Sequence, residues 1–264
     1  MGFAETLEDM EKEKTGGRRV KSVDRAFDIL EYVKKANGST LTNIATDLNM
    51  SPSTVSNYLY TLRESGYLTK INSEYYIGFP LLSLGWEAQN RYRLHRIAES
   101  EVHRIINETD GRFMVMVVEN DEGICLYQTQ NRGAIITDKN IGDKIELHCT
   151  ALGKAYLAEI PEQEAKEILR DKGLPRWTEN TITNDEEFFK ELEQTRERGF
   201  AINDEERVIG MRAIGAPIKT QNGEPLGSIS ISGPITQFKD ELFYEEIPTM
   251  LLELSRVIAV QESF

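Results

Sequence analysis

The chain has 264 residues, with 31 Lys and Arg against 44 Asp and Glu, a formal net charge of −13 and a sequence pI of about 4.9. This length allows one large domain or two modest ones. No apolar run approaches the roughly 20 residues of a transmembrane helix, and the acidic N-terminus does not resemble a secretory signal. The cysteines, Cys125 and Cys149, are too few for a disulfide scaffold or a four-cysteine zinc site, so we expect a protein of the reducing cytoplasm.

Charge is distributed unevenly along the chain. Residues 1–17 hold five acidic and two basic residues, whereas residues 18–80 hold eight basic and six acidic ones, and residues 81–264 therefore carry −12. DNA phosphates repel an acidic protein, but a small basic segment beside a larger acidic one is expected when only the first contacts a polyanion. The acidic remainder indicates either a salt-rich host or, more simply, a solvated surface.

Hydrophobic periodicity distinguishes the first residues from the helix that follows. Residues 1–17 lack it and end in two glycines, so we expect a flexible lead-in. Val23–Ala36 is predicted to be a helix because apolar residues recur at intervals of three and four. Ser22 is the expected N-cap, and the turn-forming Asn37-Gly38 ends the helix.

Two further helices and a hairpin are predicted before residue 80. The helices run from about Thr42–Leu48 and Pro52–Ser65, separated by a short turn, and a first-turn proline preceded by a serine suits the start of the second. Strand-forming Tyr67–Ile71 and Tyr75–Ile77 flank a turn-forming centre, which predicts a β-hairpin. Three helices followed by a hairpin are typical of a winged helix-turn-helix.

The exposed face of the third helix carries the signal for DNA binding within this predicted domain, residues 18–80. Its side chains are short or planar hydrogen-bonding groups, whereas a merely solvated helix would favour Glu, Lys and Gln. Such groups can reach base edges and phosphates in the major groove. The expected DNA-contacting residues, including basic ones before the first helix and on the hairpin, are Arg18, Arg19, Lys21, Arg25, Ser51, Ser53, Thr54, Ser56, Asn57, Tyr58 and Lys70.

Residues 81–109 are predicted to form a linking helix, because an apolar start leads into a long helical pattern from about Trp86 to Glu108. Such a helix can carry the N-terminal module or pair with another subunit. His95 and His103 lie eight residues apart on roughly one face. No Cys stands at ligand spacing, and we expect surface or interface histidines rather than a metal site.

The remainder, residues 110–264, alternates strand and helix patterns. Strands are expected at 113–118, 123–128, 200–202, 211–218 and 226–231, and helices at 151–159, 161–172, 185–198 and 241–260. Strand pairs joined by tight turns favour a mainly antiparallel sheet with helices packed on it. The fold class predicted for this part is therefore α+β.

Several ordered segments carry a family resemblance. They are residues 22–30, 51–56, 66–68, 147–155, 199–206 and 216–217 through 230–234. In this order they resemble the IclR family of bacterial and archaeal transcription regulators. The resemblance implies an N-terminal winged helix, a linking helix and a GAF-like effector-binding domain at residues 110–264. It also implies dimers, often paired into tetramers, that control genes of small-carbon or aromatic catabolism.

The expected effector site combines a helix start with a strand. Thr150-Ala151-Leu152 lies where a strand gives way to a helix, whose backbone N–H groups suit a carboxylate. Ser230 and Ser232 alternate on one strand, so they face one side and can bind one ligand, although a solvated strand surface is an alternative. The resemblance implies a pocket lined by Thr150, Ala151, Leu152, Asn203, Met211, Ala213, Ser230 and Ser232.

Two of these positions depart from the family pattern. Asn203 stands where many members have Asp, and Ala213 where many have Cys or Ser. Asn both donates and accepts hydrogen bonds, whereas ionised Asp only accepts, and Ala213 removes a polar group. We therefore do not expect the ligand of a familiar member to transfer to this chain.

The favoured function is a sequence-specific transcription regulator. Its expected partners are a double-stranded DNA operator, a small organic acid or sugar-derived effector, and further copies in a homodimer or dimer of dimers, with no membrane and no cofactor. One alternative is an enzyme whose winged helix is only an interaction module, with Cys149 as nucleophile and His148 as base. Adjacent residues on a strand point to opposite faces, which disfavours this pair. No metal cluster, phosphate loop or nucleophile elbow is found. Another alternative is a DNA-binding scaffold whose sensor pocket is filled by bulky side chains.

Overall fold

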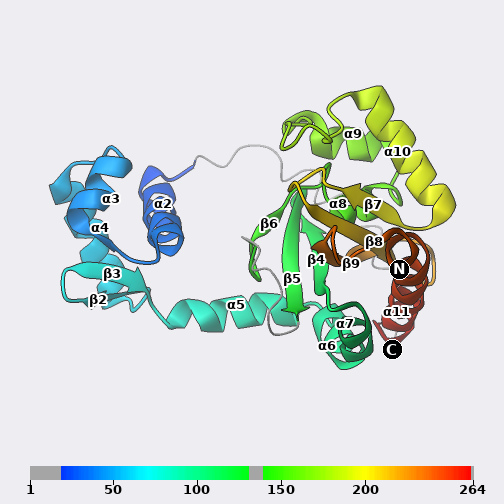
Figure 1. The fold of residues 1–264 in the computed structure, drawn as a ribbon. Helices are drawn as coiled ribbons and strands as arrows, with labels where there is room; N and C mark the ends of the chain where they lie inside the picture. Colours follow the sequence, from blue (N-terminus) through cyan, green and yellow to red (C-terminus); the bar gives the residue numbers. More distant parts are fainter. Residues whose placement is uncertain (1–18, 131–138, 263–264) are drawn as a thin grey trace, which may run out of the picture. The chain divides into compact units, whose positions relative to one another are not determined.

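The computed structural model describes residues 19–130 and 139–262 (Figure 1). The chain divides into two compact units, one ending at Ala88 and the other beginning at Gln89. The expected lead-in of residues 1–17 and the expected DNA contact Arg18 lie outside the described residues. Within the described ranges, no helix combines the length and apolar character needed to cross a membrane.

The N-terminal unit has the predicted order of three helices followed by a hairpin. Its elements are α2 (Lys21–Ala36), β1 (Ser39–Thr40), α3 (Leu41–Asp47), α4 (Pro52–Glu64), β2 (Leu68–Ile71) and β3 (Glu74–Ile77). The hairpin β2–β3 is antiparallel, and β1, which sequence patterning does not predict, pairs with the other edge of β3. This arrangement confirms the winged helix-turn-helix.

The start of α2 differs from the prediction. The helix begins at Lys21, two residues earlier than expected, because the backbone N–H groups of Val23 and Asp24 already reach the carbonyl of Val20. Ser22 therefore lies inside the first turn and does not cap the helix. The cap position is Val20, which supplies no side-chain hydrogen bond.

One apolar core fixes the three helices of this unit. Ile29 and Val33 of α2 and Ile44 of α3 meet Val55 and Leu59 of α4, and all five are nearly or fully buried. Burying a side chain of this size contributes about 1.5–3 kcal/mol. The spacing of the buried residues turns one face of α4 inward, so the opposite face of that helix is left on the surface.

The predicted single linking helix is wrong. The segment forms three helices, α5 (Pro80–Asn90), α6 (Leu94–Glu101) and α7 (His103–Thr109). Tertiary contacts lie at the first break: the Gln89 side chain donates to the carbonyl of Leu126 at 2.7 Å, and Arg91 pairs with Glu119 at 2.6 Å. These contacts hold residues 89–91 against the neighbouring sheet and let α6 turn its apolar face inward.

The two histidines of this segment occupy different environments. His95 is buried in α6, where its Nδ1 lies 2.7 Å from the carbonyl oxygen of Tyr92, so its expected place on a surface or interface is wrong. Burial lowers the pKa of His95, despite the hydrogen bond with Tyr92, because the apolar surroundings disfavour the imidazolium. His103 is exposed.

The C-terminal unit is built on a six-stranded sheet with strand order β6-β5-β4-β9-β8-β7 (Figure 1). All its strand pairs are antiparallel, as predicted. The strands are β4 (Arg112–Glu119), β5 (Glu122–Gln130), β6 (Lys144–Ile145), β7 (Ala201–Asp204), β8 (Met211–Lys219) and β9 (Pro225–Pro234). The helices are α8 (Ala151–Leu157), α9 (Glu162–Arg170), α10 (Asp185–Arg198), a π-helical turn η1 (Leu242–Glu246) and α11 (Ile247–Glu262).

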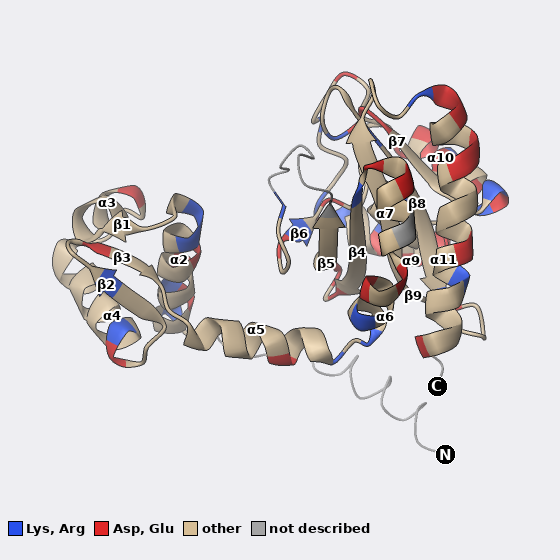
Figure 2. Cartoon of the chain, turned by 60° about the horizontal axis from the view of Figure 1, so that its bottom comes forward, with Lys and Arg blue, Asp and Glu red and all other residues tan. Residues whose placement is uncertain are grey.

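Alternation along the strands sends side chains into two separate cores. Phe113, Val115 and Val117 of β4 pack with α6, α7 and α11, whereas Met114 and Met116 pack with α8, α9 and α10. This period of two is expected of a sheet covered on both faces. Acidic residues gather on α10 (Figure 2). The carboxylates of its first turn stabilise the positive end of the helix dipole.

The start of α8 lies unusually close to the sheet. A Cβ atom at Gly215 of β8 would meet the carbonyl oxygen of Ala151 at 2.3 Å, so only glycine permits this approach. Ser228 of β9 is fully buried and donates to the carbonyl of Leu152 at 2.8 Å. These two contacts fix the beginning of α8 over β8 and β9.

Candidate DNA-binding surface and effector pocket

The expected recognition helix is α4, and its two faces have separate roles. Val55, Leu59 and Leu62 point into the core, whereas Ser53, Ser56 and Asn57 are exposed, with Thr54 and Tyr58 half-buried at the edges. The exposed set forms a row of hydrogen-bonding groups on a rigid helix. A helix held in this way presents its side chains to a groove at little cost in conformational entropy.

Ser51 has a structural role that the sequence analysis also anticipates. As the N-cap of α4, its Oγ accepts a hydrogen bond from the backbone N–H of Thr54 at 3.2 Å. The same Oγ lies 2.7 Å from Thr54 Oγ1 and 3.1 Å from Ser53 Oγ. Ser51 therefore organises the first turn, and its hydroxyl reaches a phosphate only by giving up one of these contacts.

The described basic residues of the expected DNA-binding set lie in the N-terminal unit (Figure 2). All of them are exposed. Lys21 and Arg25 lie on α2, and Lys70 lies on β2 with its Nζ 5.2 Å from the centre of the Tyr75 ring. Arg19 pairs with Asp24 at 3.0 Å, but its side chain is 85% exposed. Such an exposed pair is weak and yields readily to a phosphate.

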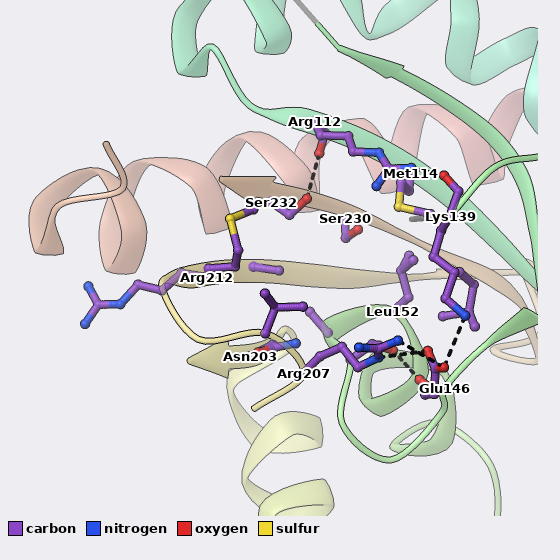
Figure 3. Close-up of a pocket in the computed structure, with 16 residues that line it drawn as sticks. Arg112, Met114, Lys139, Glu146, Leu152, Asn203, Arg207, Arg212, Ser230 and Ser232 are labelled. Carbon is purple, nitrogen blue, oxygen red and sulfur yellow. Dashed lines mark hydrogen bonds and ion pairs between the residues drawn. The ribbon is translucent and has the colours of Figure 1, made fainter. Parts of the chain in front are cut away.

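A pocket in the C-terminal unit brings together all eight residues of the expected effector site. It lies between the β4–β9–β8 face of the sheet, the start of α8 and the loop between β7 and β8 (Figure 3). About 110 Å³ is open to the centre of a water molecule. The pocket also contains lining residues that sequence analysis missed: Arg112, Met114, Lys139, Ile145, Glu146, Arg207, Val208 and Arg212.

The three serines at alternate positions of β9 have different hydrogen-bonding roles. Ser228 anchors α8, Ser230 lines the pocket, and Ser232 donates to the carbonyl of Arg112 at 3.4 Å. Ser230 is 3% exposed, and no side-chain hydrogen bond is formed by its hydroxyl within residues 19–130 and 139–262. Ser230 is thus the serine whose hydroxyl is open to a ligand, whereas Ser232 already has a weak partner.

Asn203 joins two backbone segments at the floor of the pocket. Its Nδ2 donates to the carbonyl of Cys149 at 2.8 Å, and its Oδ1 accepts from the backbone N–H of Glu206 at 3.1 Å. An ionised Asp accepts but does not donate, so it would face the Cys149 carbonyl without a proton. Asn203, in place of the Asp of many family members, can therefore both donate and accept the two hydrogen bonds found here.

Thr150 joins the start of α8 to the backbone of Glu146 beside the pocket. Its Oγ1 accepts from the backbone N–H of Gly153 at 3.0 Å as the N-cap of α8, and donates to the carbonyl of Glu146 at 2.5 Å. The hydroxyl of Thr150 is therefore occupied by the fold. Ala151 and Leu152 follow it in the pocket wall, and the carbonyl of Leu152 is occupied by the hydroxyl of Ser228.

Three charged side chains converge at one wall of the pocket. Glu146 pairs with Lys139 at 3.1 Å and with Arg207 at 3.2 Å (Figure 3). Burial opposes ionisation of Glu146, but hydrogen bonds from Arg207 and Lys139 prevail and hold the pKa of its carboxyl below the usual value. The Arg207 guanidinium also lies 3.8 Å from the centre of the Trp177 ring, so it is held from two sides.

Comparisons with known sequences match both units. The sequence model described as "Bacterial transcriptional regulator IclR C-terminal" matches residues 87–260, and the one described as "IclR helix-turn-helix domain" matches residues 22–71. The chain belongs to the IclR family. It is a transcription regulator with a helix-turn-helix DNA-binding domain, and its curated relatives are regulators rather than enzymes.

Individual IclR relatives cover nearly the whole chain. The regulator BhcR of Paracoccus denitrificans is 33% identical over 86% of this chain and 82% of its own, and the probable regulator ArcR of Halobacterium salinarum is 27% identical over 92% and 94%. The crystal structure of the Thermotoga maritima IclR has a TM-score of 0.78 at 31% identity, covering 93% of this chain and all of that one. An IclR homolog from Microbacterium hydrocarbonoxydans shares the fold, with a TM-score of 0.78 at 20% identity over 91% of this chain and 98% of its own.

The alternative of a cysteine enzyme is contradicted by the surroundings of Cys149 as well. Cys149 is fully buried, and burial raises the pKa of its thiol to about 12, so it is not a thiolate at neutral pH. His148 Nε2 lies 2.9 Å from the carbonyl oxygen of Pro175 and so faces a structural partner. Within the described ranges, no group of three His, Cys, Asp or Glu is placed to hold a metal ion.

A buried ion network behind the pocket of this IclR protein has no clear signature in the sequence. Lys154 of α8 is 1% exposed, makes a short contact with Glu206 and lies 3.6 Å from Glu191. Glu191 also pairs with Arg198 at 2.6 Å. Burial raises the pKa of Glu206 even though Lys154 pulls it down. Only the folded sheet brings Lys154 and Glu206, 52 residues apart, into contact.

Proposed function

We propose that this IclR-family regulator binds operator DNA through α4 and the β2–β3 hairpin, under the control of a small organic acid in the pocket of the C-terminal unit. In this proposal residues 18–80 are the DNA-binding domain, 81–109 the linking segment and 110–264 a GAF-like effector-binding domain. The protein acts in the cytoplasm, where its DNA partner lies.

The observation that carries the effector is the pocket itself. It combines apolar walls from Met114, Leu152 and Met211 with the cations Lys139 and Arg207 and the open hydroxyl of Ser230. Mostly apolar pockets with a few converging polar groups are typical small-molecule sites, and cations select anions. The Microbacterium IclR homolog is a complex with 4-hydroxybenzoate, an organic acid, which supports this class of ligand.

The DNA interface follows from the exposed face of α4. Ser53, Ser56 and Asn57 face base edges in a major groove, while Lys70 and the residues at the start of α2 contact phosphates. Two copies of the chain, alone or in a dimer of dimers, would read half-sites about 34–36 Å apart or a multiple of that distance. An effector changes this binding only by preferring one arrangement of the assembly.

The test is a fluorescence-anisotropy titration of full-length protein on the DNA upstream of its own gene, against an unrelated duplex, with and without a panel of organic acids. Saturable, competitor-resistant binding that one acid shifts is expected. The double substitution Ser230→Ala and Ser232→Ala should remove the response to the acid and leave DNA binding in its absence intact. An unchanged response in the double variant would contradict the pocket assignment, and an absence of specific DNA binding would contradict the DNA interface.

A further inference from the structure

The exposed face of α4 carries an aromatic side chain as well as its row of short polar groups. Tyr60 is 61% exposed. It follows Asn57 by three residues and Ser56 by four, and residues at these spacings are neighbours on a helix surface. Long side chains on a helix point back toward its N-terminus, so the Tyr60 ring covers the surface beside Ser56 and Asn57. The ring therefore lies among the side chains that the proposed function brings to base edges.

The other tyrosine of α4, the expected DNA contact Tyr58, lies toward the opposite side of the helix. It follows Val55 by three residues and precedes Leu62 by four, and both of these residues are buried. Tyr58 is half-buried and packs against the core of the N-terminal unit. Of the two tyrosines, Tyr60 is thus the one whose ring a groove can reach.

Arg63 contacts the Tyr60 ring and also pairs with the acidic residue of α4. Its guanidinium carbon lies 5.7 Å from the centre of the Tyr60 ring, which is within the range of a cation–π contact. Its Nη2 lies 2.8 Å from a carboxylate oxygen of Glu64. The charge on Glu64, which would repel DNA phosphates, is therefore offset beside the ring.

The fold itself does not require an outward ring at this position. Tyrosine is a mediocre helix former, and within residues 19–130 and 139–262 no side-chain hydrogen bond is formed by the Tyr60 hydroxyl. An apolar ring in water gains free energy when it is buried against another apolar group. In the major groove that group is the C5 methyl of thymine, because the other base edges present mainly hydrogen-bond donors and acceptors.

We propose that Tyr60 is a specificity-determining residue that recognises a thymine in each operator half-site through the C5 methyl group. This inference rests on the proposed function, since it requires α4 to enter the major groove. The Tyr60 ring packs on the methyl group, while Ser53, Ser56 and Asn57 hydrogen-bond to neighbouring base edges. The Tyr60 hydroxyl takes no part in this contact.

The test is uracil substitution in the operator fragment, because uracil differs from thymine only by lacking the C5 methyl group. Each thymine of the fragment bound by the full-length natural chain is replaced in turn, and the affinity is measured by fluorescence anisotropy. We call the loss of affinity at a given position the uracil penalty. At one or more positions the uracil penalty should be about fourfold, the factor gained by burying one methyl group.

The variants assign the uracil penalty to the ring. Tyr60→Ala should weaken binding to the unmodified fragment by at least about fivefold and should abolish the uracil penalty at the contacted position. Tyr60→Phe keeps the ring and should keep the penalty. Phe27→Ala is the matched control, because Phe27 is a 60% exposed ring on α2 of the same unit, and its removal should leave the penalty unchanged.

The outcomes separate this inference from the proposed function. If the natural chain does not bind the fragment specifically, the DNA interface and this inference both fail. If it binds but no position shows a uracil penalty that Tyr60→Ala removes, only the inference fails. Loss of the penalty in Tyr60→Phe would show that the hydroxyl carries the contact, which also overturns the inference. Alanine is the best helix former and Tyr60 is exposed, so Tyr60→Ala should melt at the same temperature as the natural chain.

Discussion

The two units of this regulator prepare their functional side chains in opposite ways. On α4, core residues such as Leu59 hold the helix while Ser53 and Asn57 stay in solvent. In the pocket, Asn203, Ser230 and the nearby Lys154 are buried, and Asn203 and Lys154 hold parts of the fold together. Changes on α4 should therefore affect DNA binding without affecting stability, whereas changes around the pocket should affect both.

Removal of the buried lysine should have the largest effect. Lys154→Met keeps the volume but leaves Glu206 and Glu191 without their cation, which should cost about 3–5 kcal/mol in the free energy of unfolding at about pH 7. Urea denaturation monitors this loss. Lys166→Met, at an exposed lysine paired with Glu162, is the control and should leave the midpoint unchanged.

The pH dependence of the destabilisation in Lys154→Met tests whether the loss comes from the charge of Glu206. Burial raises the folded-state pKa of Glu206 above its usual value. The contribution of this group to the free energy of unfolding is therefore fully present below the usual pKa, and it is lost as the pH rises through the folded-state pKa. Without Lys154 that folded pKa rises further. The destabilisation should therefore shrink between about pH 7 and about pH 5. A loss that is independent of pH would instead indicate a packing defect.

Asn57→Ala on α4 should weaken binding to the operator by about 5–150-fold, the range for loss of one side-chain contact with a base. Because Asn57 is exposed, the melting temperature should not change. Anisotropy titrations and thermal melts of the same samples measure both. Gln163→Ala, at an exposed position of α9, provides the matched control, and equal weakening in that variant would argue against α4 as the recognition helix.

Asn203→Asp tests the dual role of a pocket residue. The substitution removes the donor to the Cys149 carbonyl and should cost about 1–3 kcal/mol in the free energy of unfolding. Asn184→Asp is the control, because Asn184 caps α10 as an acceptor and Asp caps equally well. Denaturation curves that do not distinguish the two variants would show that the Asn203 donor contributes nothing to stability.

Arg19→Gln should have the smallest effect. Its ion pair with Asp24 is exposed, so the melting temperature should stay constant. Binding to DNA should weaken at low salt, and the slope of log affinity against log salt concentration should decrease by about one if Arg19 contacts a phosphate. Arg170→Gln, beside Asp171 on the surface of the C-terminal unit, should leave that slope unchanged.

Local patterns predict most of the N-terminal unit, but not β1 or the start of α2. The Ser51 cap, the buried spacing of α4 and the hairpin turn all depend on residues within a few positions of one another, and each is confirmed. Strand alternation predicts Ser230 and the family resemblance implies Asn203 as pocket residues, and both line the pocket.

Long-range contacts explain what sequence analysis missed. At the first break of the linking segment Gln89 reaches Leu126, 37 residues away, and Glu146 meets Arg207 across 61 residues. A buried lysine such as Lys154 has the same local pattern as an exposed one. Helical periodicity predicts a surface for it, and only the closed sheet reveals that carboxylates surround it.

The hydrogen bonds and close contacts that pocket residues make with the backbone limit which positions can change when ligand preference evolves or is redesigned. Asn203 and Thr150 are committed to backbone contacts, and Gly215 leaves no room for a side chain beneath α8. Variation that keeps the protein folded is therefore concentrated at the wall positions Ala213, Val208 and Met211, for which no side-chain tie is recorded among the described residues. A library for a new ligand specificity should begin with these three codons.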